Sequence, residues 1–305
     1  MSLHLCSGDF ELFDLTNNDT IHFITTILQI SSTYGIVHKY IALVICMFGS
    51  VANAMHIFVL TRPIMRKSSV NQLLSIIAVC DICTMLSYTV YIIRFDVMID
   101  HNNPPPGYQL KWVIFAIAHV VVSIALHTIT LYLCVVTAYM RYFSIKKFEC
   151  RLNQTNLSCF IFIITMICVA VLCIPTLLVH EIRRVENPNR EILYGVQISE
   201  LSLGSTCFLF KLNLWLTGIF FKVIPCVLLI VFTIALLMEL QNNRRKHRVL
   251  VSGNSLIAKK RESRRDRTTL MLVILLAVFL CTELPQGERK PKLKKYTGNA
   301  RNHFL

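Results

Sequence analysis

The sequence predicts an all-α membrane protein, a bundle of helices that crosses the bilayer several times. Its 305 residues are 54% hydrophobic and only 16% charged, whereas about 25% charged residues is usual in a soluble domain. Apolar runs of about 20 residues, enough to span a hydrocarbon core of roughly 30 Å, recur along the chain. Because the first 20 residues contain no Lys or Arg, no cleavable signal peptide is expected.

Six spans are expected, in a bundle that covers residues 38–287. They are about 39–60, 69–93, 112–139, 157–179, 213–239 and 268–287. An extracellular segment of residues 1–37 precedes the bundle, and a basic tail of residues 288–305, expected to be disordered, follows it. The loop 180–211 is expected to be long and of mixed charge. No seventh apolar run follows, so the chain is expected to be truncated before a seventh helix.

The first two spans each carry a polar position in an apolar run. Gly49 and Asn53 lie four residues apart in span one, so they share one helix face. Asp81 is the acid of span two. An intramembrane acid faces the bundle interior or water, because ionised groups are costly in hydrocarbon.

The third span begins at Trp112, an aromatic residue of the kind that prefers the membrane interface. His119, Ser123 and His127 recur every four residues and therefore lie along one face of this helix. Such a stripe is more often hydrogen bonded inside a bundle than used to hold a metal. No acid or thiol stands at ligand spacing, so a metal site is not expected.

Spans four to six each carry a proline, and the last two also carry a charge. Pro175, Pro225 and Pro285 are expected to bend or break their helices. Lys222 and Glu283 fall within about one helical turn of each other in height above the ends of their helices. We therefore expect these two charges to pair or to flank a ligand in the outer half of the bundle.

Orientation follows from the basic residues in the loops. Loops 61–68, 140–156 and 240–267 contain three, four and ten Lys or Arg, whereas residues 1–37 contain none and loops 94–111 and 180–211 contain two and four. Cytosolic loops carry the excess of Lys and Arg, so the amino terminus is expected outside. The net charge of +14 is thus attributed to membrane orientation, and no nucleic-acid partner is expected.

These residues together resemble the rhodopsin-like (class A) G-protein-coupled receptors. The resemblance is carried by Gly49 with Asn53, by Asp81, by Arg141-Tyr142 closing span three, and by the three prolines. The stretches LTRPIMR, GIFFKVIPC and FLCTELPQG are more specifically similar to nematode myosuppressin/FMRFamide-type neuropeptide receptors. The resemblance covers about residues 35–287.

The resemblance implies a plasma-membrane receptor that binds a neuropeptide and passes the signal to a heterotrimeric G protein. It implies that Arg141 and Tyr142 act as the cytosolic switch, and that Asp81 with Asn53 forms a water site that could hold sodium. The ligand residues are then expected to be His119, Ser123, His127, Lys222 and Glu283.

The sequence also departs from that family. Met140 precedes Arg141 where an acid is usual, and no cysteine lies between Arg94 and Cys134. Cys207 is therefore expected either to be free or to pair with Cys6. Because a seventh span is missing, an alternative stays open. The chain is then a truncated isoform that is non-signalling or dominant-negative, or it is an incomplete gene model. An enzyme is not expected, because the sequence lacks zinc, nucleophile-elbow and phosphate-loop motifs.

Overall fold

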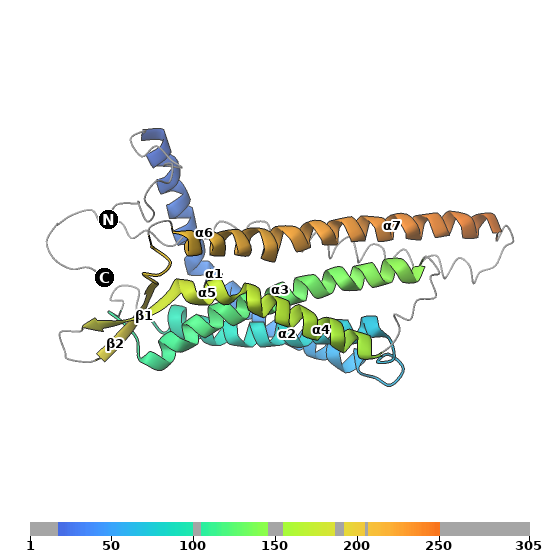
Figure 1. Cartoon of the computed structure of the whole chain (residues 1–305), viewed down its shortest axis with the longest axis horizontal. Helices are drawn as coiled ribbons and strands as arrows, with labels where there is room; N and C mark the ends of the chain where they lie inside the picture. Colours follow the sequence, from blue (N-terminus) through green and yellow to red (C-terminus); the bar gives the residue numbers. More distant parts are fainter. Residues whose placement is uncertain (1–17, 100–104, 146–154, 187–191, 205–206, 251–305) are drawn as a thin grey trace.

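The computed structural model describes residues 18–99, 105–145, 155–186, 192–204 and 207–250. Within these residues, long helices run side by side and a short antiparallel hairpin lies at one end of the bundle (Figure 1). The prediction of an all-α helical bundle is confirmed. The expected sixth span 268–287 and the tail 288–305 lie outside the described residues.

The helical elements occur in the order α1 (Asn18–Leu60), α2 (Ser69–Ile92), the π-helical segment η1 (Ile93–Val97), α3 (Leu110–Ile145), α4 (Thr155–Leu172), α5 (Ile174–Val179), α6 (Phe208–Trp215), the π-helical segment η3 (Leu216–Val223) and α7 (Ile224–Leu250). Among the described residues, five helices are long and apolar enough to cross a membrane: Val37–Leu60, Ser69–Val97, Leu110–Ser144, Leu157–Val179 and Phe208–Glu239. Helix α1 starts well before Lys39, where the first span was expected to begin.

Two prolines determine where helices break. Pro175 has no N–H to donate and disfavours helical geometry in the residue before it, so α4 ends and α5 starts anew around Cys173. Pro225 stands in the first turn of α7, where its missing N–H is tolerated. The π-helical segment η3 lies directly before it, so α6, η3 and α7 together form one span with an irregular middle.

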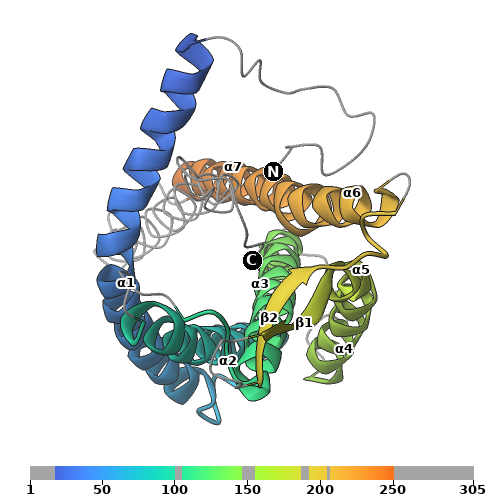
Figure 2. The same ribbon diagram turned by 90° about the vertical axis from the view of Figure 1, so that its left-hand side faces the viewer.

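Helix α3 is the central helix of the described bundle. It packs against α2, α4 and α7, while α1 packs on the far side of α2 (Figure 2). In the most apolar part of each span, 39% of the α3 residues are buried but only 11% of the α1 residues. Large apolar side chains such as Phe48 and Met47 on α1 are exposed in the isolated chain. They suit a surface that meets lipid rather than water.

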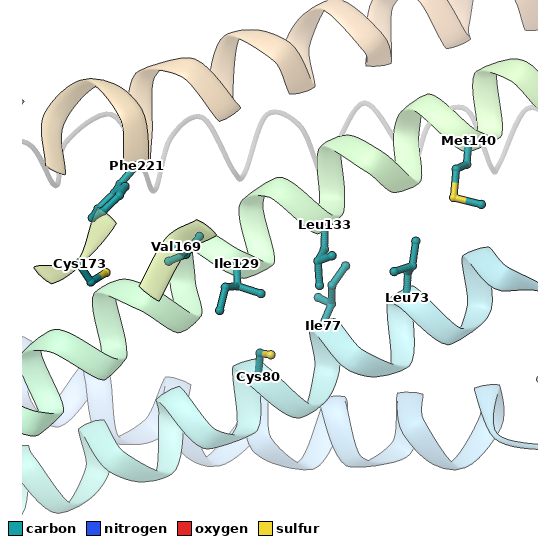
Figure 3. Packing of buried hydrophobic residues seen from close by; sticks show 9 residues of the cluster. All are labelled: Leu73, Ile77, Cys80, Ile129, Leu133, Met140, Val169, Cys173 and Phe221. Carbon is teal, nitrogen blue, oxygen red and sulfur yellow. The ribbon is translucent and has the colours of Figure 1, made fainter. Parts of the chain in front are cut away.

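The hydrophobic core lies where α3 meets its neighbours (Figure 3). It contains residues from α2, α3, α4, the α4–α5 break and η3: Leu73, Ile77, Cys80, Ile129, Leu133, Met140, Val169, Cys173 and Phe221. At one end of the bundle, the Ser158 hydroxyl on α4 also donates to the backbone carbonyl of Ser69 on α2, at 3.0 Å. The relative positions of α2, α3 and α4 are thereby fixed by both apolar packing and a buried hydrogen bond.

The connection 180–211 was expected to be a long loop, but much of it forms two β-strands. Strands β1 (His180–Glu186) and β2 (Ile192–Ile198) pair as an antiparallel hairpin. Tyr108, just before α3, adds an isolated bridge to Tyr194 of β2 through two backbone hydrogen bonds of 2.9 and 2.8 Å. Gly107 permits this approach, since a Cβ there would stand 3.0 Å from Leu193 Cβ and 3.1 Å from the Tyr194 carbonyl oxygen. The hairpin is therefore attached to the start of α3.

Candidate functional site

Of the polar residues predicted to bind ligand that the structure describes, His119 is the most enclosed. It is 7% exposed, and its imidazole stacks on the rings of Tyr88, Tyr91 and Phe115 with centroids 5.9, 4.8 and 6.0 Å away. His119 Nδ1 lies 3.2 Å from Ser87 Oγ. Because the Ser87 hydroxyl itself donates to the Thr84 carbonyl, this geometry favours Nδ1 of His119 as the donor.

The same aromatic group extends to α1. His38 Nε2 lies 3.1 Å from the Tyr88 hydroxyl, and His38 Nδ1 lies 3.0 Å from the Tyr34 hydroxyl. An imidazole that bridges two phenols connects α1 to α2, and Tyr88 connects α2 to His119 on α3. Three helices thus meet in one polar and aromatic cluster near the hairpin end of the bundle.

Further toward the hairpin, Arg94 of η1 lies over two aromatic rings. Its guanidinium carbon is 4.9 Å from the centroid of Trp112 and 5.7 Å from that of Tyr108. The pKa of Tyr108 is raised, mainly by burial; the charge of Arg94 lowers it and that of Asp96 raises it. The phenol therefore stays neutral at physiological pH and does not neutralise the arginine.

Asp81 lies between α2 and α3, as the sequence predicted for an intramembrane acid. The Thr130 hydroxyl donates to Asp81 Oδ1 at 3.3 Å, and His127 interacts with this carboxyl electrostatically. Asn53 is half-buried on α1 and makes no hydrogen bond among the described residues. Among the described residues, two side chains with oxygen atoms, Asp81 and Thr130, and the imidazole of His127 meet here, a smaller oxygen set than hard cations choose. The sodium ion remains a prediction.

The predicted ligand residues on α3 therefore face α2. His119 and His127 have their partners on that helix, and Ser123 lies half-buried one turn from each. Lys222 lies in η3 and is half-buried. Among the described residues it has no hydrogen bond and no ion pair.

The segment η3, which carries Lys222, is joined to α3 by a side-chain hydrogen bond to its backbone. The Ile224 N–H donates to the Ile219 carbonyl, and Pro225 has no N–H. The Phe220 carbonyl thus lacks both donors that would continue the helical pattern from it. The Tyr132 hydroxyl of α3 donates to this carbonyl at 2.8 Å. A side chain from the central helix therefore replaces the hydrogen bond that the proline removes.

At the opposite end of the bundle, α3 closes with the predicted switch residues. Arg141 and Tyr142 are both half-buried, and the Tyr142 ring meets that of Phe143 edge-on at 5.5 Å. Met140, in the place of the usual acid, is 3% exposed and belongs to the apolar core. Arg141 has no ion pair among the described residues.

This architecture agrees with the comparison to known proteins. Residues 40–290 match the family described as serpentine type 7TM GPCR chemoreceptor Srw. The chain belongs to this family. It is also 29% identical over 306 aligned positions to the G-protein coupled receptor dmsr-1 of Caenorhabditis elegans, an alignment that covers 85% of this chain. The chain spans 59% of the length of that relative.

The Srw family membership makes this chain a G-protein-coupled receptor and a multi-pass membrane protein. The prediction that it is not an enzyme is confirmed, since the family and the relative are receptors. Neither match favours the alternative of a non-signalling isoform or an incomplete gene model.

Some predicted residues of this Srw receptor lie outside the described residues. They include Glu283, the expected partner of Lys222, and Pro285. Cys207 is disulfide-bonded, so the alternative of a free Cys207 thiol is wrong. Cys6, the partner that the sequence suggested, also lies outside the described part of the chain.

The structure also adds residues to the site that the sequence did not indicate. Thr130, Tyr132 and Arg94 act through contacts with other helices or loops, and no local pattern in the sequence marks those contacts. Tyr88 and Tyr91 stand three residues apart, a spacing that places them on one helix face. That spacing was a signal for the aromatic cluster.

Proposed function

We propose that this Srw receptor binds a neuropeptide of the FMRFamide/myosuppressin type at the hairpin end of the bundle. The amino terminus would lie outside the plasma membrane, and a heterotrimeric G protein would bind at the opposite end. Class A membership and the peptide class are carried over from the resemblance of GIFFKVIPC and FLCTELPQG.

The observation that carries this proposal is the hairpin attached to the start of α3. The side chains of Glu181, Arg183 and Arg184 on β1 are exposed, and Arg183 Nη1 donates to Gln197 Oε1 across the hairpin at 3.2 Å. Extended backbone with charged side chains suits recognition of a peptide. A small apolar ligand would instead favour an enclosed apolar pocket.

Orientation rests on the basic loops. The turn between α1 and α2, which contains Arg62, Arg66 and Lys67, lies at the end opposite the hairpin (Figure 1). Lys and Arg gather on the cytosolic side, so the hairpin would face outward. The end of α3 with Arg141 and the extension of α7 beyond Glu239 to Leu250 would then face the G protein.

The test uses the full chain with an amino-terminal epitope tag, expressed in cultured cells. We expect antibody to bind the tag in intact cells, and synthetic peptides ending in Arg-Phe-amide to activate a G protein in a resonance energy-transfer assay. We expect Glu181→Gln to weaken the response to these basic peptides, whereas Glu200→Gln, also exposed at this end, serves as the matched control.

Two results would contradict the proposal. One is a tag that antibody reaches only after permeabilisation. The other is a receptor that is present on the surface but responds to small organic chemicals and to no peptide, as the word chemoreceptor in the family description would suggest.

A further inference from the structure

Arg94 presents a guanidinium that is held in place but has no anionic partner in the part of the chain that the structure describes. It is half-buried, and among the described residues it makes no hydrogen bond and no ion pair. Asp96 stands two residues away and still does not pair with it within the described structure. A planar guanidinium carries five N–H donors in a fixed fork. Within the described ranges, no acceptor meets these donors of Arg94.

The rings beneath Arg94 are themselves fixed. Phe95 meets Tyr108 at 5.1 Å and Trp112 at 6.4 Å, and Trp112 meets Phe115 at 6.1 Å. Tyr108 is also joined to the hairpin by its two backbone hydrogen bonds with Tyr194. The guanidinium is therefore pre-positioned by stacking, so that binding an anion orders little that is not already ordered.

Among the described residues at this place, two cations stand against one acid, Asp96, whose charge also acts on Tyr108. Lys111 Nζ lies 5.9 Å from the centroid of the same Trp112 ring. Two cations thus lie near one indole, beside the hairpin where we place the ligand. The guanidinium fork matches a carboxylate in a bidentate way, while an ammonium offers only a point charge.

We propose that Arg94 is a specificity residue that binds a carboxylate of the peptide ligand. The inference rests on the proposed function, since it requires a peptide at the hairpin end. The carboxylate could come from an Asp or Glu side chain or from a free carboxyl terminus. Arg94 then selects among peptides that share the same aromatic and basic end.

The experiment uses a set of synthetic Arg-Phe-amide peptides in matched pairs that differ only in one residue, Asp in one member and Asn in the other. A further arm repeats each Asn member with a free carboxyl terminus, which separates the two sources of carboxylate. Potency is measured on the full chain and on Arg94→Gln and Arg94→Lys. Arg66→Gln, which removes an exposed arginine in the turn at the other end of the bundle, is the matched control.

In the unmodified receptor we expect at least one carboxylate peptide to exceed its uncharged twin by about tenfold to a hundredfold, as for a hydrogen-bonded charge pair. Arg94→Gln should abolish this preference and leave the uncharged twin nearly unaffected. Arg94→Lys should keep only part of it, because lysine lacks the fork. Arg66→Gln should keep all of it. If Arg94→Gln does not reach the surface, the partial loss in Arg94→Lys carries the test.

Three outcomes would overturn the inference while leaving the proposed function intact. They are peptide responses with no preference for a carboxylate, a preference that survives in both Arg94 variants, and an equal loss of potency for every peptide. The last would mean that Arg94 serves packing or contacts lipid phosphate. A receptor that is on the surface and answers to no peptide would contradict the proposed function itself, and the inference with it.

Discussion

Removing the Tyr132 hydroxyl should loosen the fifth span without changing the core. In Tyr132→Phe the ring stays, but the Phe220 carbonyl loses the donor that stands 2.8 Å away. Phe220 is exposed in the isolated chain, so the relevant scale is that of hydrogen bonds between transmembrane helices, which average about 0.6 and reach about 1.7 kcal/mol. We therefore expect a loss of about 1 kcal/mol in the free energy of unfolding.

That loss corresponds to a fall of about 2–4 °C in the melting temperature of a chain of this size class. The assay is thermal unfolding in detergent, followed with a dye that becomes fluorescent on reaction with thiols, at one fixed scan rate. The buried thiols of Cys46, Cys80 and Cys173 become reactive on unfolding and supply the signal. Tyr139→Phe is the matched control. Its ring packs on Phe143 and Phe232, but its hydroxyl has no hydrogen bond among the described residues.

A double-mutant cycle sharpens the test. Pro225→Ala restores an N–H five residues after Phe220, at the spacing of a π-helical bond. In that background the Tyr132→Phe change should cost clearly less, because the carbonyl has a second donor. The reasoning is refuted if Tyr132→Phe melts like Tyr139→Phe, or if its cost is the same with and without Pro225.

Three further predictions use the same melting assay. Thr137 has a buried hydroxyl without a hydrogen-bond partner in the described structure, so Thr137→Val should raise stability by about 1 kcal/mol; a lower melting temperature would contradict this. His119→Ala should lower the free energy of unfolding by about 2–4 kcal/mol, because it leaves a cavity among three rings. His119→Phe keeps a ring there and should lower it much less. Equal effects of the two variants would show that stacking does not matter. Gly107→Ala should shift the hairpin and make it more sensitive to protease. Gly218→Ala, where nothing lies within 4 Å of the added atom, should leave the protease sensitivity unchanged. Equal cleavage of the two variants would contradict the packing argument.

The sequence predicted the parts of the fold that depend on composition along one helix. Hydropathy indicated the spans, and the cost of burying a charge predicted that Asp81 faces another helix, where Thr130 meets it. Residues four apart predicted a common face for His119 and His127, and both have partners on α2. These are local properties, and periodicity alone suffices for them.

What the sequence did not predict depends on contacts between distant segments. The sequence of β1, HEIRRVE, does not indicate a strand, because it mixes charges with few apolar residues. The hairpin depends instead on the pairing of β1 with β2 and on the bridge from Tyr108 to β2. The expected pairing of Lys222 with Glu283 stays a prediction, because Glu283 lies outside the described residues. Its depth estimate assumed regular helices, whereas η3 is π-helical and changes the rise and rotation. Arg94 was counted only as a loop charge, because its ring partners come from two other segments.

The central claim, that the hairpin end faces outward and receives the ligand, is tested most directly by labelling in intact cells. Arg183→Cys places a thiol on the exposed strand β1, and Arg66→Cys places one in the turn between α1 and α2. With a membrane-impermeant maleimide, and with the unmodified chain as background, we expect labelling at 183 and none at 66. Labelling at 66 and not at 183 would contradict the account.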